Sequence, residues 1–590
     1  MIEAGTTLCD LTIPSSLDTM VERLSAPGYA GATVELWVLD GQDRRQAARD
    51  RLRALGIDAF VRCAYKPLVH AALEEIDLAG VKTITIRYPV VDGVPEKRFA
   101  LEAHPLADLV GETQVQLEAV APVDGTGLVA YAVVLVGNGG VSRSLQVQAP
   151  NRFVTDPAGQ RVYNPCGWLK VRGAADPALD CDAAFETDQE AAFRAATETL
   201  ADLARNGAQP FFDRLEMHIE APFFDRKLPV GHESLSTAEA MHEDLYFSAL
   251  DVFKIAQGLS LADRTLRPGQ LVPVLRTRNG PLRARLVTNV DPVLEQDLSD
   301  PAGALTDLAQ AGSWLEPGTV KAHLDDLGGD AFTVHSQRGR PVWATMIDGP
   351  GPGLVITAGQ HANETSGPVG ALRAAKKLAT GNRNRFCIAP LVNPDGYALF
   401  RELCRDYPAH MNHAARFTAS GCDLHHVARG FENEAHYIGR ERTGATLHMN
   451  LHGYPAHEWT RPFAGYIPRH AEAWALPRGF ALILLHHPGW QEKGRAILDA
   501  VIDALAGDTH LVELNRQQRD RSSLYAGSFP LEHRKDIPFV VEEAPEELFP
   551  LTIITEAPDE TVDGDLFRLF HTAQMTAVLA AADAARSVLV

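Results

Sequence analysis

The first part of the chain alternates between segments with helical apolar spacing and strand-like runs. Helical spacing covers residues 15–24 and 44–55. Strand-like runs, β-branched or alternating, cover residues 32–39, 59–64 and 81–90. From about residue 99 to residue 147 the pattern is again that of strands. We therefore predict a small mixed α/β accessory domain with a β-rich portion over residues 1–155.

A second accessory segment of α+β type is predicted over residues 156–320. Long amphipathic helices are indicated at residues 186–206 and 238–255, with a strand between them at 215–220. The turn signals Pro268-Gly269 and Asn279-Gly280 predict strands and hairpins over residues 265–293. His218 and Glu220 share a strand face without a third ligand, which favours a solvated surface pair. The first half of the chain thus suggests topology but no chemistry.

From about Gly328 the pattern becomes strand, loop and helix in turn. Residues 354–358 and 386–392 read as strands, and residues 368–378 between them as a helix. Strands that alternate with helices predict a largely parallel sheet covered by helices. Functional sites in such sheets lie beyond the carboxyl ends of the strands. We expect one α/β domain over residues 321–590, with its site at that edge.

His361 and Glu364 follow the strand at residues 354–358 directly, so both lie at its carboxyl end. A separation of three residues on a turn allows an imidazole nitrogen and a carboxylate oxygen to bind one cation. Ser366 is placed to cap the following helix, and Pro368 suits its first turn. The position of the pair makes it a predicted metal site.

A second strand, residues 447–452, ends in His452 before the turn Gly453-Tyr454-Pro455. His448 is the alternative ligand, because strand alternation places it on the same face. We favour His452, since the turn puts it at the end of the strand. Two histidines and one glutamate form the three-ligand set of an open zinc site, whose fourth position holds a water molecule. Zinc lowers the pKa of that water to about 7.

A hydrolytic zinc site also needs a general base that can later protonate the leaving group. The run of residues 551–556 is a third strand that ends in a carboxylate, Glu556. Glu542 and Glu543 end a similar run and compete for this role. Glu556 is preferred because a helical segment, residues 565–584, follows it and closes the chain.

Composition argues against two classes of binding partner, nucleic acids and membranes. The formal net charge of -21 argues against binding to nucleic acid. The longest apolar run, residues 128–137, is about half of what a membrane-spanning helix needs. The seven cysteines contain no C-x-x-C pair, and the first residues show no signal peptide. We expect a cytoplasmic protein with reduced thiols, Cys422 included, and no membrane or nucleic-acid partner.

Five elements of the C-terminal half resemble the zinc carboxypeptidases, the carboxypeptidase A-like metallopeptidases, in order and approximate spacing. They are His361-x-x-Glu364, Asn393-Pro394-Asp395-Gly396-Tyr397, Gly421-Cys422-Asp423-Leu424, His452-Gly453-Tyr454 and Glu556. The resemblance covers about residue 328 to the C-terminus. It implies an α/β fold with a mixed sheet flanked by helices, one Zn²⁺ per chain, and a glutamate-assisted water that cleaves a C-terminal amide bond.

By position, the resemblance assigns the general base to Glu556. It implies an arginine that polarises the scissile carbonyl, for which Arg416 is the best placed, with Arg401 and Arg405 as alternatives. Tyr525 lies at about the distance of the family's substrate-contacting tyrosine, and Tyr454 follows the third ligand. The Asn-Pro-Asp-Gly element reads as a structural turn.

The sequence departs from the family at one informative place. The family carries Asn-Arg after its Gly-x-Asp element, and this pair binds the terminal carboxylate of a substrate. Here His425 and His426 occupy these positions. Neutral imidazoles do not reproduce the bidentate contact of an arginine. The residue types leave open whether a free carboxylate is required.

The sequence thus predicts a zinc metallocarboxypeptidase that acts on a peptide or peptide-like substrate. One alternative is a zinc amidase or deacylase of a small acylated amine or amino acid. A second is a non-catalytic binding protein that retains the fold. Assembly into a homo-oligomer and the role of the N-terminal half are left open.

Overall fold

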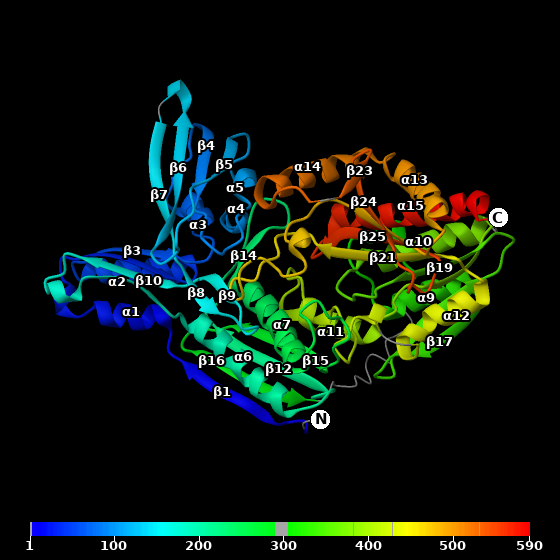
Figure 1. Ribbon diagram of the computed structural model, residues 1–590, viewed down its shortest axis with the longest axis horizontal. Coiled ribbons are helices and arrows are strands. Elements are labelled where there is room, and N and C mark those ends of the chain that lie inside the picture. The colour runs from blue at the N-terminus through cyan, green and yellow to red at the C-terminus, as the bar shows by residue number, and fades with distance from the viewer. Residues whose placement is uncertain are drawn as a thin grey trace.

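The computed structural model describes residues 3–140, 142–289, 305–381, 383–426, 429–529 and 531–589. We call residues 3–289 the N-terminal half and residues 305–589 the C-terminal half. Figure 1 shows the two halves side by side, with the strands of the N-terminal half at the left and a large sheet at the right. Residues 290–293, the end of the stretch predicted to form strands and hairpins, lie outside the described ranges.

The C-terminal half is built on a nine-stranded mixed sheet in the order β17-β18-β20-β19-β21-β25-β22-β24-β23. Its central strands are parallel: β20 (Arg385–Ala389), β19 (Gly353–Ala358), β21 (Leu447–Pro455) and β25 (Leu551–Glu560). The outer strands are β17 (Asp330–His335), β18 (Pro341–Ile347), β22 (Ala481–His486), β23 (Glu532–Arg534) and β24 (Ile537–Glu543). The predicted mixed sheet is confirmed.

Helices cover both faces of this sheet because consecutive residues of its central strands are apolar. Leu354 and Ile356 of β19 belong to the main core, whereas Val355 belongs to a second apolar cluster on the opposite face. On one face lie α10 (Ser366–Gly381), α13 (Gln491–Leu505) and α15 (Gly564–Val588); α12 (Glu434–Thr443) covers the other. The remaining long helices are α9 (Pro317–Leu327), α11 (Pro394–Asp406) and α14 (Thr509–Ala526). Flanking helices on both faces agree with the predicted fold class.

The N-terminal half contains three four-stranded sheets. The first comprises β5 (Gln114–Ala119), β4 (Val81–Tyr88), β6 (Val129–Gly137) and β7 (Ser142–Ala149). The second comprises β11 (Cys181–Phe185), β10 (Gly167–Arg172), β2 (Thr33–Val38) and β3 (Asp58–Cys63). The third comprises β1 (Thr7–Ile13), β16 (Leu282–Asn289), β12 (Arg214–Ala221) and β15 (Gln270–Thr277). Smaller pairs are β8 (Asn151–Thr155) with β9 (Arg161–Pro165), and β13 (Asp225–Lys227) with β14 (Ser234–Ser236).

Two of these sheets cross the predicted domain boundary at residue 155. Strand β1 pairs with β16, and β10 pairs with β2, although about 130 to 280 residues separate the partners in each pair. The helices of this half are α1 (Ser16–Leu24), α2 (Gln42–Ala54), α3 (Pro67–Glu74), α6 (Asp188–Asn206) and α7 (Thr237–Ala256). Residues 1–155 and 156–289 are therefore interwoven rather than separated at residue 155.

The expected run of strands from residue 99 begins instead with two short helices, α4 (Arg98–Glu102) and α5 (Leu106–Leu109). Every residue from Arg98 to Leu106 is buried, so burial does not follow the period of either a helix or a strand in this stretch. This part of the prediction is wrong because short apolar stretches fit both periods. The strands that follow, β5 and β6, lie where the sequence predicts them.

Helix α7 joins the two halves. Almost every residue from Thr237 to Phe253 is buried, including four carboxylates. Glu239 Oε1 lies 3.0 Å from His457 Nε2, and Glu243 Oε2 lies 2.5 Å from His413 Nδ1. Asp244 and Asp251 each lie 3.3 Å from a guanidinium nitrogen of Arg461. Each of these carboxylates therefore faces a cationic side chain of the C-terminal half, with Asp244 and Asp251 sharing Arg461. Burial raises the pKa of Asp244 to about 7.

One hydrophobic core runs through both halves, from Trp37 of β2 through Phe253 of α7 to Leu354 of β19 and Phe567 of α15. Separating the halves would expose this apolar surface together with the buried charges of α7. Within the described ranges, every helix is too short or too polar to cross a lipid bilayer.

The buried histidines opposite α7 predict that stability falls as the pH rises. Burial acts to lower the pKa of His413 and of His457, but the facing glutamates raise these values to about 10 and about 9. A histidine whose pKa is raised on folding adds its full stabilisation below about pH 6.5, the pKa of the unfolded state. This stabilisation is lost as the pH rises through the folded-state pKa. The thermal unfolding midpoint should therefore drop steadily between pH 6.5 and 10.

The control is the variant His457→Gln, measured over the same pH range. It should unfold at a lower temperature than the wild type at pH 6.5, and its midpoint should fall less between pH 6.5 and 10. An equal fall in both proteins would show that His457 does not carry this dependence.

Candidate metal centre and its cavity

His361 and Glu364 lie on the loop between β19 and α10, where they are fixed by a tight turn. The backbone N–H of Glu364 donates to the carbonyl of His361, with 3.2 Å between N and O. His361 Nδ1 lies 2.7 Å from Glu364 Oε1. The loop starts at Gly359, whose φ is +65° and where a Cβ would lie 2.9 Å from Leu391. The turn thus brings both predicted ligands to the carboxyl end of β19.

His452 meets this pair from the neighbouring strand β21. Its Nδ1 lies 2.9 Å from Glu364 Oε2 and 3.2 Å from His361 Nδ1. Gly453 N–H donates to the same Oε2 over 3.0 Å, and a Cβ at this glycine would lie 2.0 Å from Asp559. His448, the alternative ligand, instead has its Nε2 2.8 Å from the hydroxyl of Thr357. The structure therefore brings His452, rather than His448, next to His361 and Glu364.

The trio of His361, Glu364 and His452 fits a zinc ion in donor type and in spacing. All three side chains are buried, and their candidate ligand atoms lie within 4.8 Å of one another. Atoms bound at 2.0–2.1 Å to a tetrahedral centre lie roughly 3.3 Å apart. The observed separations of 2.7, 2.9 and 3.2 Å are close to that value. A cation between them would relieve two imidazole nitrogens that face each other.

The charge of Glu364 is strongly favoured at this position. Burial acts to raise its pKa, but His361 and His452 together bring the pKa well below its usual range. The pKa of His452 is also lowered, because burial lowers it more than Glu364 raises it, and for a histidine this favours the neutral form. An ionised carboxylate and a neutral imidazole are the protonation states that bind a metal.

A second layer of polar groups orients the ligands. Asp423 Oδ1 lies 3.5 Å from His361 Nε2, and Gln360 Nε2 donates to the same oxygen over 3.4 Å. Asn450 Nδ2 in turn donates to Gln360 Oε1 over 3.2 Å. Carboxylates that hold the far nitrogen of a ligating histidine fix the orientation of its ring. Asp423 has this position, which the sequence indicates only as part of a motif.

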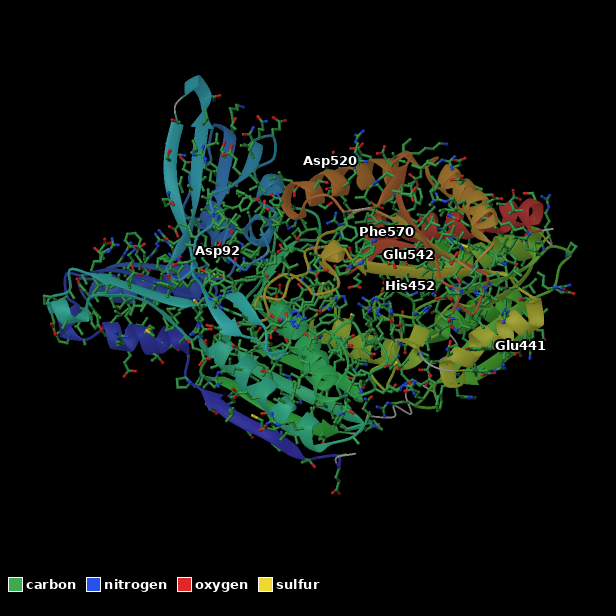
Figure 2. The ribbon with its side chains drawn as sticks, viewed as in Figure 1. Asp92, Glu441, His452, Asp520, Glu542 and Phe570 are labelled. Carbon is green, nitrogen blue, oxygen red and sulfur yellow. The ribbon has the colours of Figure 1, made fainter. Side chains whose placement is uncertain are left out.

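Glu556 lies on β25 directly beside His452, its register partner on β21. It lines the same cavity, and its pKa is raised well above the usual value by burial first and then by Glu364. Of the competing glutamates, Glu542 lines the cavity from β24, two strands beyond β25, and Glu543 does not line it. Figure 2 labels His452 and Glu542 on the nine-stranded sheet. Among the three, Glu556 is on the strand next to the trio.

Arg416 also reaches the cavity, from the turn that follows the short helix His413–Ala415. The carboxylates of Glu364 and Asp423 counter the effect of burial and keep its pKa raised. Arg401 is paired with Glu316 over 2.8 Å, and Arg405 is exposed on α11; neither lines the cavity. Arg416 is thus the arginine that the structure brings to the trio.

The turn that carries Arg416 is held by the N-terminal half. His413 is fully buried between Glu243 of α7, 2.5 Å away, and Glu560 of β25, 3.3 Å away. The carbonyl of His413 accepts the N–H of Arg416 over 2.9 Å. The pairing of His413 with Glu243 could not be predicted, because residues 170 positions apart show no common pattern in the sequence.

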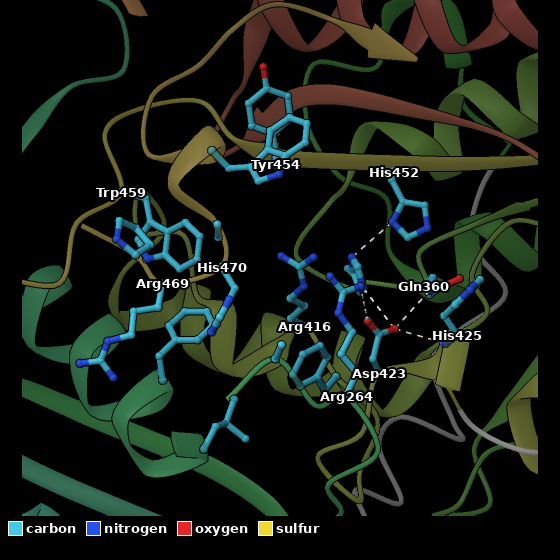
Figure 3. Close-up of a pocket in the computed structure, with 18 of the residues that line it drawn as sticks. Arg264, Gln360, Arg416, Asp423, His425, His452, Tyr454, Trp459, Arg469 and His470 are labelled. Atoms are coloured by element: carbon cyan, nitrogen blue, oxygen red, sulfur yellow. Dashed lines mark hydrogen bonds and ion pairs between the residues drawn. The ribbon is translucent and has the colours of Figure 1, made fainter. Parts of the chain in front are cut away.

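The predicted substrate-binding residues differ in where they lie. His425 lines the cavity, and its Nε2 is 2.8 Å from Glu547. Tyr454 borders the cavity, but its hydroxyl donates to the carbonyl of Gly479 over 2.7 Å and points away from His452 (Figure 3). The side chain of His426 lies outside what the structure describes.

Tyr525 is the predicted site residue that the structure places elsewhere. It lies on α14, fully buried, and does not line the cavity. Its hydroxyl accepts the N–H of Ala107 over 2.7 Å, and its ring packs edge-on against His104. The sequence spacing to Glu556 suggested a substrate contact, but the contact that forms is one between α14 and the N-terminal half.

The Asn-Pro-Asp-Gly element has a structural role, as its residue types indicate. Asn393 caps α11 by accepting the N–H of Gly396 over 2.9 Å. Asp395 is buried and accepts from Arg340 over 2.9 Å and from the hydroxyl of Ser336 over 2.8 Å. Ser366, predicted to precede its helix, is already the first residue of α10, and Asp559 accepts its N–H over 2.7 Å.

The cavity beside the trio has a volume of about 480 Å³ and is lined by both halves of the chain. From the C-terminal half come the trio's histidines and the polar groups around them (Figure 3). From the N-terminal half come Phe247, Leu250, Asp251 and Lys254 of α7 and the following residues 261–264 and 266. The wall supplied by the N-terminal half has no signal in the sequence, which shows only an amphipathic helix there.

A second group with metal-binding residue types lies between the halves: His104, Glu233 and Glu458. The ammonium of buried Lys66 pairs with Glu458 and already supplies a positive charge. The hydroxyl of Tyr466 donates to Glu458 over 3.1 Å. This group therefore reads as a neutralised structural cluster.

Several solved structures match part of the chain at low sequence identity. A metallo-carboxypeptidase of Burkholderia cenocepacia is 15% identical, covering 52% of this chain and 73% of its own, with a TM-score of 0.28. Carboxypeptidase A of Helicoverpa armigera is 14% identical, covering 54% and 90%, with a TM-score of 0.29. A metallo-carboxypeptidase of Pseudomonas aeruginosa is 11% identical, covering 46% and 70%, with a TM-score of 0.28. No curated protein matches the sequence.

The sequence of residues 332–451 matches the family model Peptidase_M14, described as zinc carboxypeptidase. The matched range starts in β17 and ends in β21, one residue before His452. It contains His361, Glu364 and Asp423. The match covers about a fifth of the chain, and in this part the sequence is similar to the zinc carboxypeptidases.

Proposed function

We propose that this protein is a zinc-dependent hydrolase that cleaves an amide bond, as a metallocarboxypeptidase acting on a peptide or peptide-like substrate. The observation that carries the proposal is the placement of Glu556 on the strand beside His452, facing the same cavity as the trio. His361, Glu364 and His452 would hold one Zn²⁺. When bound, zinc polarises a carbonyl and lowers the pKa of a water molecule.

Glu556 is the group of the chain that moves the proton. In the proposed reaction it accepts a proton from the attacking water and passes it to the nitrogen of the leaving amine. Its raised pKa in the metal-free chain reflects burial and the negative charge of Glu364. A divalent cation at the trio would offset that charge and favour the ionised base.

Arg416 has the position and charge to stabilise the oxygen of the scissile carbonyl. Its guanidinium faces the cavity on the same side as Asp423 (Figure 3). A preorganised cation in a site of low dielectric constant stabilises negative charge as it develops in the transition state. The pairing of His413 with Glu243 would hold the Arg416 turn in place during this step.

One alternative keeps the chemistry and changes the substrate: a zinc amidase or deacylase of a small acylated amine or amino acid. It is favoured by His425 and His426, which stand where the family carries its carboxylate-binding Asn-Arg pair. A second alternative is a binding protein that retains the fold without turnover. A cytoplasmic location and the state of assembly stay predictions.

The choice of His452 over His448 is testable by metal titration. His452→Ala removes a ligand, so Zn²⁺ affinity should fall by more than about 100-fold, since losing a supporting group alone costs about 10- to 100-fold. Competition with a chromogenic chelator measures the affinity. His448→Ala is the matched control on the same strand and should still bind one Zn²⁺ per chain with wild-type affinity. The opposite ranking would reassign the third ligand.

The role of Glu556 is testable by a change that removes its charge and keeps its shape. Glu556→Gln should lower kcat by about 10²- to 10⁴-fold, the usual contribution of a general base, while Zn²⁺ content stays at the wild-type level. Hydrolysis of acetylated dipeptides measures kcat. The matched control is Glu543→Gln on β24, which should leave kcat unchanged. Unchanged turnover in Glu556→Gln would contradict the mechanism.

A further inference from the structure

The positive side chains of the cavity fall into two groups. Arg461 and Arg469 are paired with Asp251 over 3.3 and 3.4 Å. Lys254 donates to the carbonyl of Leu261 over 2.8 Å. The remaining arginines, Arg416 and Arg264, face the cavity differently: Arg416 has no ion-pair partner among the described residues, and Arg264 has only a contact of 4.0 Å with Asp423.

Arg264 belongs to the N-terminal half, on the segment that follows α7. The thiol of Cys422 donates to its backbone carbonyl over 3.5 Å, which ties the segment to the C-terminal half beside Asp423. The side chain is 63% exposed, and it lines the cavity rather than packing against protein. Figure 3 shows Arg264 beside Asp423, reaching into the cavity like Arg416.

The side chain of Asp423 lies between Arg264 and the trio. Its Nη1 lies 4.0 Å from Asp423 Oδ2, and Asp423 Oδ1 lies 3.5 Å from His361 Nε2. Asp423 is shared between His361, Gln360 and the N–H of His425, so it neutralises Arg264 only in part. Two guanidinium groups that line one cavity repel each other unless an anion lies between or beside them.

We propose that Arg264 binds a carboxylate of the substrate next to the scissile amide bond, which makes it a specificity-determining residue supplied by the N-terminal half. The inference rests on the proposed function. Arg416 is assigned there to the carbonyl oxygen, which leaves Arg264 for a group that is anionic before the reaction. Guanidinium binds carboxylate with two parallel hydrogen bonds, whereas the imidazole of His425 offers one.

This carboxylate has two chemical sources, the C-terminus of a peptide and the carboxylate of an N-acylated amino acid. Both place the negative charge on the carbon that bears the scissile nitrogen. The substrate set therefore consists of N-acetyl dipeptides and N-acetyl amino acids, each as the free acid and as the C-terminal amide. The acid-to-amide ratio tests Arg264, and the dipeptide-to-amino-acid ratio identifies the source.

The test compares Arg264→Gln with Arg267→Gln in the full-length zinc-loaded protein. Arg267 is an exposed arginine of the same segment that does not line the cavity. Arg264→Gln should lower kcat/KM for the acids by about 10- to 100-fold, mainly through KM, as expected for one charge-assisted contact. The amides should be cleaved as by the wild type. Arg264→Lys should recover part of the loss, and Arg267→Gln should match the wild type.

A binding measurement separates this inference from the proposed function. Calorimetric titration of the Glu556→Gln protein with the N-acetyl dipeptide acids needs no turnover, and the added change Arg264→Gln should weaken binding by the same factor. Equal losses for acids and amides, or no loss for either, would overturn the role of Arg264. If the wild type cleaved neither form, the proposed function would fail, and the titration would still decide whether Arg264 binds the carboxylate.

Discussion

Buried ion pairs between α7 and the C-terminal half are the interaction on which the rest of the structure depends. Glu239, Glu243, Asp244 and Asp251 lie inside the protein, where an unpaired carboxylate is very costly. Each is acceptable there only because a histidine or arginine of the C-terminal half faces it. Removing one partner of such a pair costs about 3–5 kcal/mol, so the halves form one unit rather than a domain with an attachment.

These pairs also connect the fold to the site. Glu243 holds His413, and His413 begins the turn that carries Arg416. Further along α7, Phe247 and Leu250 line the cavity, and Arg264 follows on the next segment. The N-terminal half thus contributes both to the position of an arginine beside the trio and to the wall opposite it. Without these residues the cavity would lack one of its walls.

The sequence predicts what depends on short stretches of chain. His361 and Glu364 follow β19, whereas His452 and Glu556 lie within β21 and β25, which run beyond the predicted strand ends. The apolar runs of these strands are visible in the sequence, so the place of the four residues in one sheet could be inferred. The choice between Glu556 and Glu542 depends on strand order, and β25 lies beside β21 only in the folded sheet. The ion pairs of α7 could not be predicted, because its partners lie 170 or more residues away and opposite charges in a sequence do not show their pairing.

Tyr525 shows that spacing along the sequence alone does not place a residue in the cavity. Its distance along the chain from Glu556 is compatible with a place in the cavity, but α14 packs on the N-terminal half, whose contribution is invisible in a comparison of the C-terminal half alone. The helices α4 and α5 illustrate a local failure, since short apolar stretches fit helix and strand periods equally well.

The most direct test of the central claim is a crystal structure of the zinc-loaded protein with anomalous diffraction recorded at the zinc edge. We expect one strong peak, bound by His361, Glu364 and His452, with Glu556 and Arg416 facing it across the cavity. A peak at His448 or at the cluster of His104, Glu233 and Glu458, or no ordered zinc at the trio, would contradict it.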